Sequence, residues 1–271
     1  MISITTTELN TLLSAFLWPL TRILALVASA PALGNPSIPM RVRIGLALAI
    51  TLCVAPTLGP MPQMEPGSQA GLLILAQQVV IGLALGFTMR IVFVAVEMAG
   101  ELAGLQMGLG FATFFDPQNA GHIPVVGQFL GLIATLAFLV LNGHLQMIAL
   151  LSQSFSTLPI SGEAIAGMGL KAVVAWGGEI FAVGLLLSLP VLAALLIANL
   201  ALGILTRAAP QLNMFAVGFP VTLAIGLLVL GLALPYIVPV LERTIREGLQ
   251  MMPQITDHFH VVTQSSSLSR R

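Results

Sequence analysis

The clearest pattern in this sequence is a series of long runs that contain almost no charged residue. About twenty apolar residues let a helix cross a bilayer, and six runs approach or exceed that length. They extend over residues 12–33, 44–58, 71–89, 123–151, 172–205 and 214–241. The pattern therefore predicts about six hydrophobic helices and an all-α membrane protein.

Prolines and glycines interrupt several of these runs, so some of the helices are expected to be broken. Pro190 lies in the middle of the fifth run, and Pro220 lies near the start of the sixth. After the last run the chain becomes polar. We expect residues 253–271 to form a polar, disordered tail.

Composition supports the same class of protein. Of the 271 residues, 57% are hydrophobic and 7% are charged, whereas an ordinary soluble domain has about 45–50% and about 25%. Ten basic and ten acidic residues cancel, so the chain lacks the net positive charge that marks nucleic-acid binding. A soluble enzyme, a nucleic-acid-binding protein and a disordered chain are poor interpretations of this composition.

The basic residues do not give a consistent membrane topology. Cytoplasmic loops carry an excess of Lys and Arg, which places Arg41 and Arg43 inside. Simple alternation of six helices then leaves Arg243 and Arg246 outside, against the same rule. Either the fifth segment is re-entrant around Pro190, or some helices do not cross the bilayer in the usual way.

Charged and small residues share one side of the third segment, if residues 71–108 form one helix. At about 100° per residue, that side carries Arg90, Glu97, Glu101, Gly82, Gly86, Gly100, Gly104 and Gly108. Small residues let helix backbones approach closely, and charges at membrane depth face protein or water. The stripe is interpreted as a packing face that meets other protein helices along an aqueous channel, and its residues are the candidates for packing between subunits. The alternative is a self-contained bundle in which Arg90 pairs with Glu97.

An aromatic, glycine-containing segment follows this stripe. It consists of Gly110, Phe111, Ala112, Thr113, Phe114, Phe115, Asp116 and Pro117. The glycines at 108 and 110 make a continuous helix through Phe111 doubtful, and the Asp-Pro pair ends any helix. Irregular backbone at membrane depth must be buried in protein or line a cavity. The segment is therefore interpreted as a plug or constriction, with an interfacial aromatic anchor as the alternative.

No pattern of catalytic residues is present. The sequence lacks a nucleophile elbow, a phosphate-binding loop and a zinc-protease motif, and Cys53 is its single cysteine. We expect no enzymatic activity, no cofactor and no metal site. Five polar residues inside apolar runs are expected to hydrogen-bond between helices. They are Gln77, Gln78, Asn142, His144 and Asn199.

Several short motifs resemble the FliR family of type III export-gate proteins. The motifs are the segment 111–117, the sequence Asn142-Gly143-His144, the group Arg207, Pro210, Gln211 and Asn213, and the pair Gly218 and Pro220. The similarity covers roughly residues 10–250, in the same order and spacing.

The resemblance implies a core subunit of the flagellar protein export gate, in the bacterial inner membrane at the basal body. It implies FliP and FliQ subunits as partners in a hetero-oligomeric complex, together with other membrane proteins of the export apparatus and with exported flagellar proteins as cargo. Residues 1–160 would be FliP-like and residues 161–252 FliQ-like. The segment near 108–122 would be the pore loop that plugs the closed channel.

Two alternatives remain open. The equivalent subunit of a virulence type III secretion system shares the architecture and differs in its cargo. A small-solute secondary transporter would also contain broken helices and intramembrane charges. It would need an inverted repeat, and no convincing repeat relates the two halves of this sequence.

Overall fold

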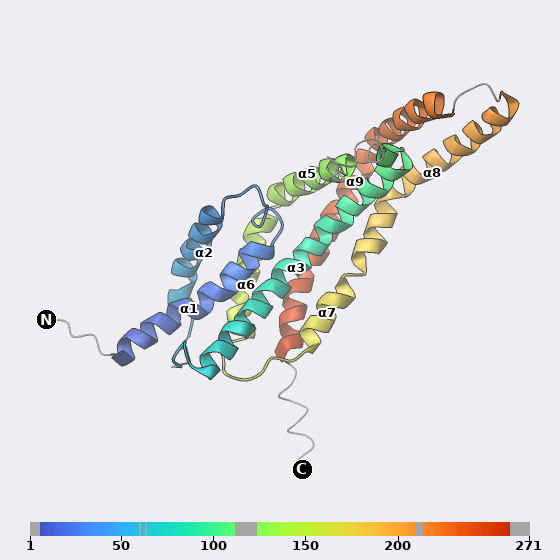
Figure 1. The fold of residues 1–271 in the computed structure, drawn as a ribbon. Helices are drawn as coiled ribbons and strands as arrows, with labels where there is room; N and C mark the ends of the chain where they lie inside the picture. Colours follow the sequence, from blue (N-terminus) through green and yellow to red (C-terminus); the bar gives the residue numbers. More distant parts are fainter. Residues whose placement is uncertain (1–5, 60, 63, 112–123, 210–213, 261–271) are drawn as a thin grey trace, which may run out of the picture. The chain divides into compact units, whose positions relative to one another are not determined.

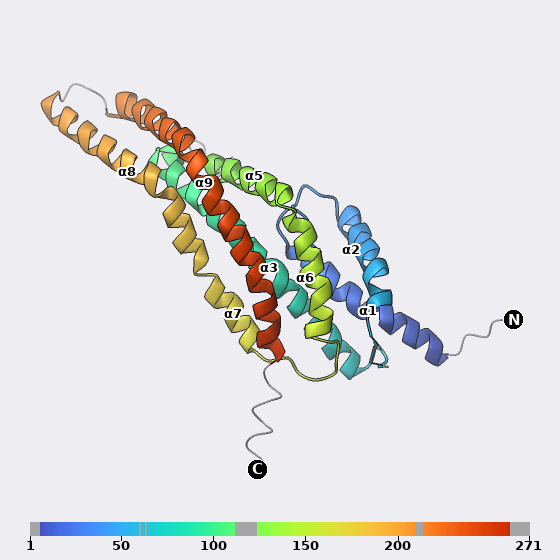
Figure 2. The same cartoon turned by 180° about the vertical axis from the view of Figure 1, so that it is seen from behind.

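The computed structural model describes residues 6–59, 61–62, 64–111, 124–209 and 214–260, and these residues form helices and turns without strands. The helices are α1 (Thr6–Ser29), α2 (Met40–Val54), α3 (Gln69–Gln106), α5 (Val125–Val140), α6 (Gly143–Thr157), α7 (Met168–Trp176), α8 (Glu179–Ala208) and α9 (Met214–His260). Short 3-10 turns lie at Ala55–Thr57 and Leu109–Phe111. The all-α fold is confirmed, and Figures 1 and 2 show the helices from opposite sides.

All six hydrophobic elements appear as helical segments. Four stretches are long and apolar enough to cross a membrane: 40–57, 69–106, 168–208 and 217–259. The helices α5 and α6 together are also apolar enough to form a fifth span, although a bend of 66° separates them. The apolar part of α1, Leu13–Ser29, is shorter. The protein is therefore a multi-pass membrane protein.

The helix breaks occur at an asparagine and at two glycines. Asn142 has φ 54° and separates α5 from α6, a conformation that asparagine tolerates better than most residues. Gly177 and Gly178 separate α7 from α8. Pro190 instead lies inside the continuous helix α8, so the chain does not turn back at that residue.

The last helix is longer than its polar end predicts. α9 runs through Pro220 and continues past Pro253 to His260, whereas the sequence suggested a disordered tail from residue 253. Burial explains the extension, because the side chains of Met252 and Ile255 are fully buried. Residues 261–271 lie outside the described residues.

The chain divides into two compact units. Unit 1 contains the residues up to 90, residues 142–177 and the residues from 246 onward; unit 2 contains residues 91–141 and 178–245. Each unit combines segments that are distant in the sequence, so the boundary predicted near residue 160 does not coincide with either unit. Whether that boundary separates a FliP-like from a FliQ-like part stays a prediction.

Each unit has its own apolar core. In unit 1, α2 lies beside α1 (Figures 1 and 2), and the core includes Trp18 of α1 and Met147 of α6. In unit 2, Phe93 of α3 meets Phe138 of α5 edge to face, with ring centroids 5.5 Å apart. Such aromatic pairs contribute about 0.5–1.5 kcal/mol beyond their buried area.

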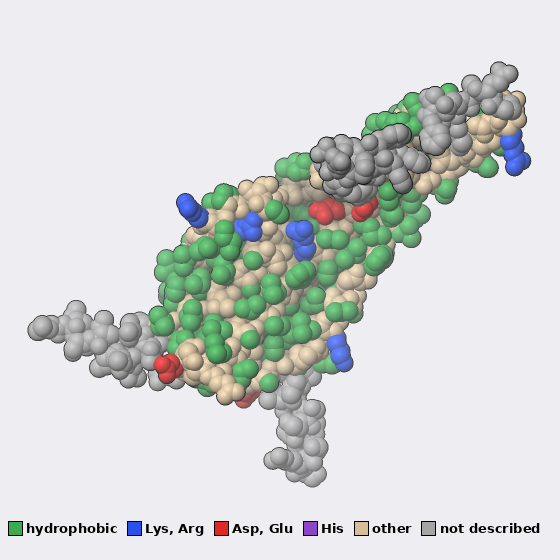
Figure 3. All heavy atoms as spheres, in the orientation of Figure 1, with side chains coloured by type: hydrophobic (Ala, Val, Ile, Leu, Met, Phe, Trp, Pro, Cys, Tyr) green, Lys and Arg blue, Asp and Glu red, His purple; other side chains and the backbone are tan. Residues whose placement is uncertain are grey.

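Large apolar side chains also remain on the outside. Figure 3 shows hydrophobic side chains spread over the face in view, with few charged ones among them. In unit 2, Val140, Phe181 and Tyr236 are respectively 80%, 67% and 78% exposed. A surface of this kind requires lipid or partner protein around it.

Candidate functional site

The segment interpreted as a plug begins directly after α3. α3 ends at Gln106, and Gly108 has φ 89°, a region that glycine enters at little cost. A 3-10 turn over Leu109–Phe111 follows. The glycines made a continuous helix through Phe111 doubtful, and α3 does end before that residue. The rest of the plug segment, defined here as Gly110–Pro117, lies outside the described residues: Ala112, Thr113, Phe114, Phe115, Asp116 and Pro117.

Met107 is the last residue before this change of direction, and it contacts α9. Its side chain is fully buried. The hydroxyl of Thr222 donates a hydrogen bond to the Met107 carbonyl oxygen at 3.1 Å. Gly226 lies one turn further along α9 and faces the Met107 side chain. The chain just before the plug segment is thus held by a helix that lies far away in the sequence.

In unit 1, the glycines of the α3 stripe lie against α1. A methyl group added to Gly82 would collide with the Arg22 carbonyl oxygen and would lie 2.7 Å from the Ala25 Cβ. At Gly86 the same addition would collide with the Ser29 hydroxyl oxygen. Both glycines therefore permit a close approach of two helices of the same chain.

In unit 2, the stripe meets α5. A Cβ at Gly100 would lie 2.6 Å from both the Cα and the backbone nitrogen of Gly127. At Gly104 the nearest atom, a Val126 methyl carbon, is 3.6 Å away, which is ordinary van der Waals contact. Of these two glycines, only Gly100 therefore allows an unusually close approach of α3 and α5.

The charged members of the stripe are all half-buried. They are Arg90, Glu97 and Glu101. Glu97 lies against α5, since its Cγ would be 3.2 Å from a Cβ added to Gly131. Contacts of these residues with other subunits, and the alternative pairing of Arg90 with Glu97, stay predictions.

A buried arginine forms the most polar cluster in unit 1. Arg22 of α1 is 0% exposed. Its Nε donates to Gln78 Oε1 at 2.8 Å, and its Nη1 donates to the Ser154 carbonyl oxygen at 3.0 Å and to the Ser154 hydroxyl at 3.1 Å. Its Nη2 donates to the Leu158 carbonyl oxygen at 3.0 Å. These bonds join α1 to α3 and to the end of α6.

Helix geometry explains how a buried cation is tolerated at this point. Ser154 and Leu158 lie at the C-terminal end of α6, where the helix dipole attracts positive charge. The Ser154 carbonyl oxygen also accepts from the Leu158 backbone N–H at 2.9 Å, whereas the Leu158 carbonyl lies beyond the last helical residue and needs a donor from elsewhere. The guanidinium carbon also lies 4.3 Å from the centre of the Phe155 ring, which adds a cation–π interaction. We call Arg22, Gln78, Ser154 and Leu158 the Arg22 cluster.

Sequence analysis identified only part of this cluster. The expectation that Gln78 hydrogen-bonds between helices is confirmed by its bond to Arg22. Arg22 itself was not assigned a role. The available signal was an isolated cation inside the first apolar run, which requires an acceptor from another segment.

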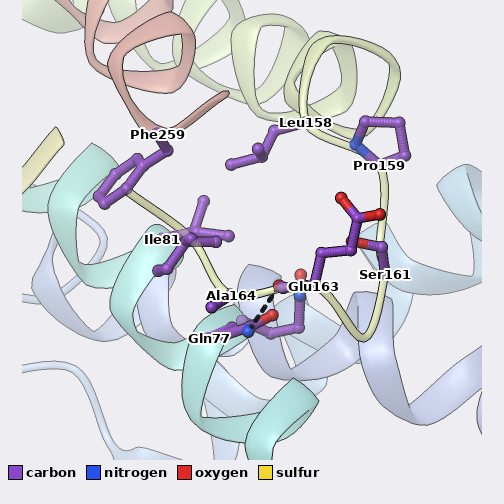
Figure 4. A pocket seen from close by; sticks show the side chains of 10 residues that line it. Gln77, Ile81, Leu158, Pro159, Ser161, Glu163, Ala164 and Phe259 are labelled. Atoms are coloured by element: carbon purple, nitrogen blue, oxygen red, sulfur yellow. Dashed lines mark hydrogen bonds between the residues drawn. The ribbon is translucent and has the colours of Figure 1, made fainter. Parts of the chain in front are cut away.

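A cavity of 540 Å³ lies beside the Arg22 cluster in unit 1. Figure 4 shows Gln77 and Ile81 of α3, the α6–α7 connection and Phe259 of α9 around it. Gln77 Nε2 donates to the Glu163 carbonyl oxygen at 2.8 Å, so the expected interhelical role of Gln77 becomes a helix-to-loop bond. The cavity wall is therefore tied to α3 directly through Gln77, while Gln78 is linked to Leu158 through Arg22.

The residues of the family motifs occupy helix ends and helix interiors. Asn142 adopts the left-handed conformation before α6, Gly143 is its buried first residue, and His144 is half-buried. Arg207 lies exposed in the last turn of α8, where a cation is favourable. Gly218 is buried and Pro220 exposed, both in α9. Pro210, Gln211 and Asn213 lie outside the described residues.

These features define an all-α, multi-pass membrane protein whose irregular aromatic segment follows a long helix. Among the residues that the structure describes, no group of three or more His, Cys, Asp or Glu side chains could hold a metal ion. The class is thus that of an all-α, multi-pass membrane protein.

Comparison with known proteins specifies the family. The family model for bacterial export proteins, family 1, matches residues 13–248. The chain is 49% identical over 242 residues to the flagellar biosynthetic protein FliR of Pectobacterium carotovorum subsp. carotovorum, covering 89% of this chain and 92% of that protein. It is 42% identical over 262 residues to FliR of Escherichia coli (strain K12), covering 97% and 100%. The chain belongs to the FliR family of bacterial export proteins.

Proposed function

We propose that this chain is a core subunit of the flagellar type III protein export gate, in the bacterial inner membrane at the flagellar basal body. The observation that carries the proposal is the similarity to proteins named FliR over nearly the whole length of both chains. The names of these relatives refer to flagellum biosynthesis and not to a catalysed reaction. The transporter alternative finds no support among these names.

In this proposal, the chain forms a channel together with FliP and FliQ subunits, and unfolded flagellar proteins pass through it. The exposed apolar side chains of unit 2 support the need for partners. Val140, Phe181 and Tyr236 are each largely exposed in the isolated chain. Surfaces of this kind bury favourably against other helices in an assembly.

The assembly is tested by co-expression with FliP and FliQ, followed by purification through a tag on this chain. We expect a ring-shaped complex that contains one copy of the chain together with both partners, visible by electron microscopy. A monodisperse preparation of the single chain, free of both partners, would contradict the proposal.

The plug segment is proposed to close the resting channel. Phe111, Phe114 and Phe115 would supply the obstruction, because a hydrophobic constriction excludes water and ions. Gly108, with its positive φ, and Gly110 would allow the segment to move aside for cargo. Energy for export would come from other components.

The plug is tested with the double substitution Phe114→Ala and Phe115→Ala in an assembled gate. We expect cells that express this variant gate to leak ions and small solutes. Phe87→Ala is the matched control, since Phe87 is an exposed phenylalanine of α3 in unit 1. If the double variant is as tight as the parent while the gate assembles, the plug proposal fails.

Cargo is tested in the organism. All relatives cited above carry flagellar names, so a deletion strain is expected to lack filaments and to be non-motile. A deletion strain that swims with normal filaments would instead assign the chain to a virulence secretion system.

A further inference from the structure

We infer that Thr222 and Gly226 of α9 are positioning residues that fix the start of the plug segment by holding Met107. We call these three residues the Met107 anchor. The inference rests on the proposed plug, but its geometry lies entirely in described residues of unit 2. It concerns the residues that keep the plug in place rather than the plug itself.

The first part of the anchor is a hydrogen bond to the end of α3. The last four carbonyl groups of a helix have no intrahelical donor and must accept a hydrogen bond from another group. The Met107 carbonyl follows the last residue of α3 and accepts from Thr222 Oγ1 at 3.1 Å. The same hydroxyl lies 3.0 Å from the Phe219 carbonyl oxygen of its own helix. Its single proton is shared between the two carbonyls.

The second acceptor distinguishes Thr222 from other buried threonines. Thr51 and Thr88 donate to the carbonyl four residues earlier in their own helices, at 2.7 Å in each case. A bond of that kind satisfies the hydroxyl without joining two elements. Thr222 additionally reaches Met107, which is 115 positions away in the sequence. Its hydroxyl therefore ties α9 to the end of α3.

The second part of the anchor is a notch at Gly226. Residues four apart lie on the same face of a helix, so Gly226 and Thr222 face Met107 together. A Cβ at Gly226 would lie 2.5 Å from Met107 Cγ, 2.7 Å from Cε and 3.0 Å from Sδ. Because the Met107 side chain is 0% exposed, it has little free space into which it could retreat.

The anchor lies where it can set the direction of the following chain. Met107 is held by its carbonyl and its side chain, and the next residue, Gly108, has φ 89°. A fixed residue immediately before a conformationally permissive glycine defines the point about which the following segment turns. Loss of the anchor would release the base of the plug while all plug side chains remain unchanged.

The experiment compares Thr222→Val and Gly226→Ala in the assembled gate. Valine keeps the shape of threonine and removes the hydroxyl, and alanine fills the notch. We expect both variants to leak, with a smaller leak than that of the Phe114→Ala, Phe115→Ala gate. Hydrogen exchange of the backbone amides of residues 108–111 should become roughly fivefold faster in Thr222→Val, as expected for the loss of one hydrogen bond.

Two conservative variants serve as controls. Thr222→Ser restores the hydroxyl and should return both measurements to the parent values. Gly231→Ala lies in the same helix, and its added Cβ would have no atom within 4 Å. It should change neither measurement.

The outcomes separate the anchor from the plug. If the plug variant leaks while Thr222→Val is tight and its amides exchange at the parent rate, the anchor is wrong and the plug stands. If the plug variant does not leak, the proposed plug fails. Faster exchange at 108–111 in Thr222→Val then still supports the tether, and unchanged exchange overturns it.

Discussion

The interiors of the two units are stabilised in different ways. In unit 1, Arg22 donates hydrogen bonds to two side chains and two backbone carbonyls from other elements. In unit 2, α5 and α8 instead approach α3 through glycines. A Cβ at Gly184 would lie 3.0 Å from the Ala95 carbonyl oxygen, and Gly100 faces Gly127.

The difference shows two separate requirements of helix packing in an apolar environment. Apolar side chains do not by themselves select which helices meet, because lipid offers a similar environment. A buried polar cluster makes the choice specific, since each unmatched group costs free energy. Glycine contacts determine how closely the helices approach. Unit 1 combines both devices, because Gly82 and Gly86 also bring α3 close to α1. The contacts of α5 and α8 with α3 described above for unit 2 are of the second kind.

Among the substitutions that test this difference, removal of the buried guanidinium should reduce the stability of the protein most. Arg22→Met would remove the guanidinium donor from Gln78 Oε1 and from the Leu158 carbonyl oxygen. We expect it to lower the free energy of unfolding by about 1–3 kcal/mol for each buried acceptor that loses its donor, measured as thermal unfolding of the purified protein in detergent. Arg22→Lys keeps the charge but not the fork of donors, so it should lose less. Equal stability of Arg22→Met and the parent would contradict the role of the cluster.

Two adjacent glutamines allow a sharper test. Gln78→Leu removes the acceptor for the Arg22 Nε and should cost about 1.5–3 kcal/mol, the range for hydrogen bonds to charged groups. Gln77→Leu removes a more exposed bond to the Glu163 carbonyl and should cost at most about 1 kcal/mol. The same thermal unfolding measurement applies. A larger loss of stability in Gln77→Leu than in Gln78→Leu would show that the buried bond to Arg22 does not stabilise the protein more than the exposed bond to Glu163.

The glycine contacts of unit 2 should give the smallest of the three effects. Gly100→Ala forces α3 and α5 apart and should cost about 1–3 kcal/mol, as overpacking does. Gly203→Ala in α8 is the matched control, because its Cβ would have no atom within 4 Å. It should be neutral or stabilising by up to about 1 kcal/mol through helix propensity. Equal effects of the two substitutions would mean that close approach is not required at Gly100.

Features that depend on local sequence were predicted correctly. The runs without charge located all six hydrophobic elements, because each run is one continuous piece of chain. The glycines at 108 and 110 marked the end of α3. The role of Gln78 followed from one polar residue in an apolar run, which must find a partner.

Features that depend on distant partners were not predicted. The acceptors of Arg22 lie 56, 132 and 136 positions away, so no pattern within one segment reveals them. For a similar reason, the sequence did not predict that the helices break at Asn142 and at Gly177-Gly178 and not at Pro190. Neighbouring groups can compensate the bond that a proline removes from a membrane helix, and the sequence does not show which groups are adjacent.

The length of α3 has a consequence for the position of its charges. A helix of 38 residues is about 57 Å long, about twice the thickness of a hydrocarbon core. Even at a tilt of about 40°, the core accommodates only about 26 residues of such a helix. The uncharged stretch Gln69–Met89 is itself long enough to cross. If that stretch is the crossing, the end that carries Arg90, Glu97 and Glu101 is the part of α3 that the hydrocarbon does not have to accommodate.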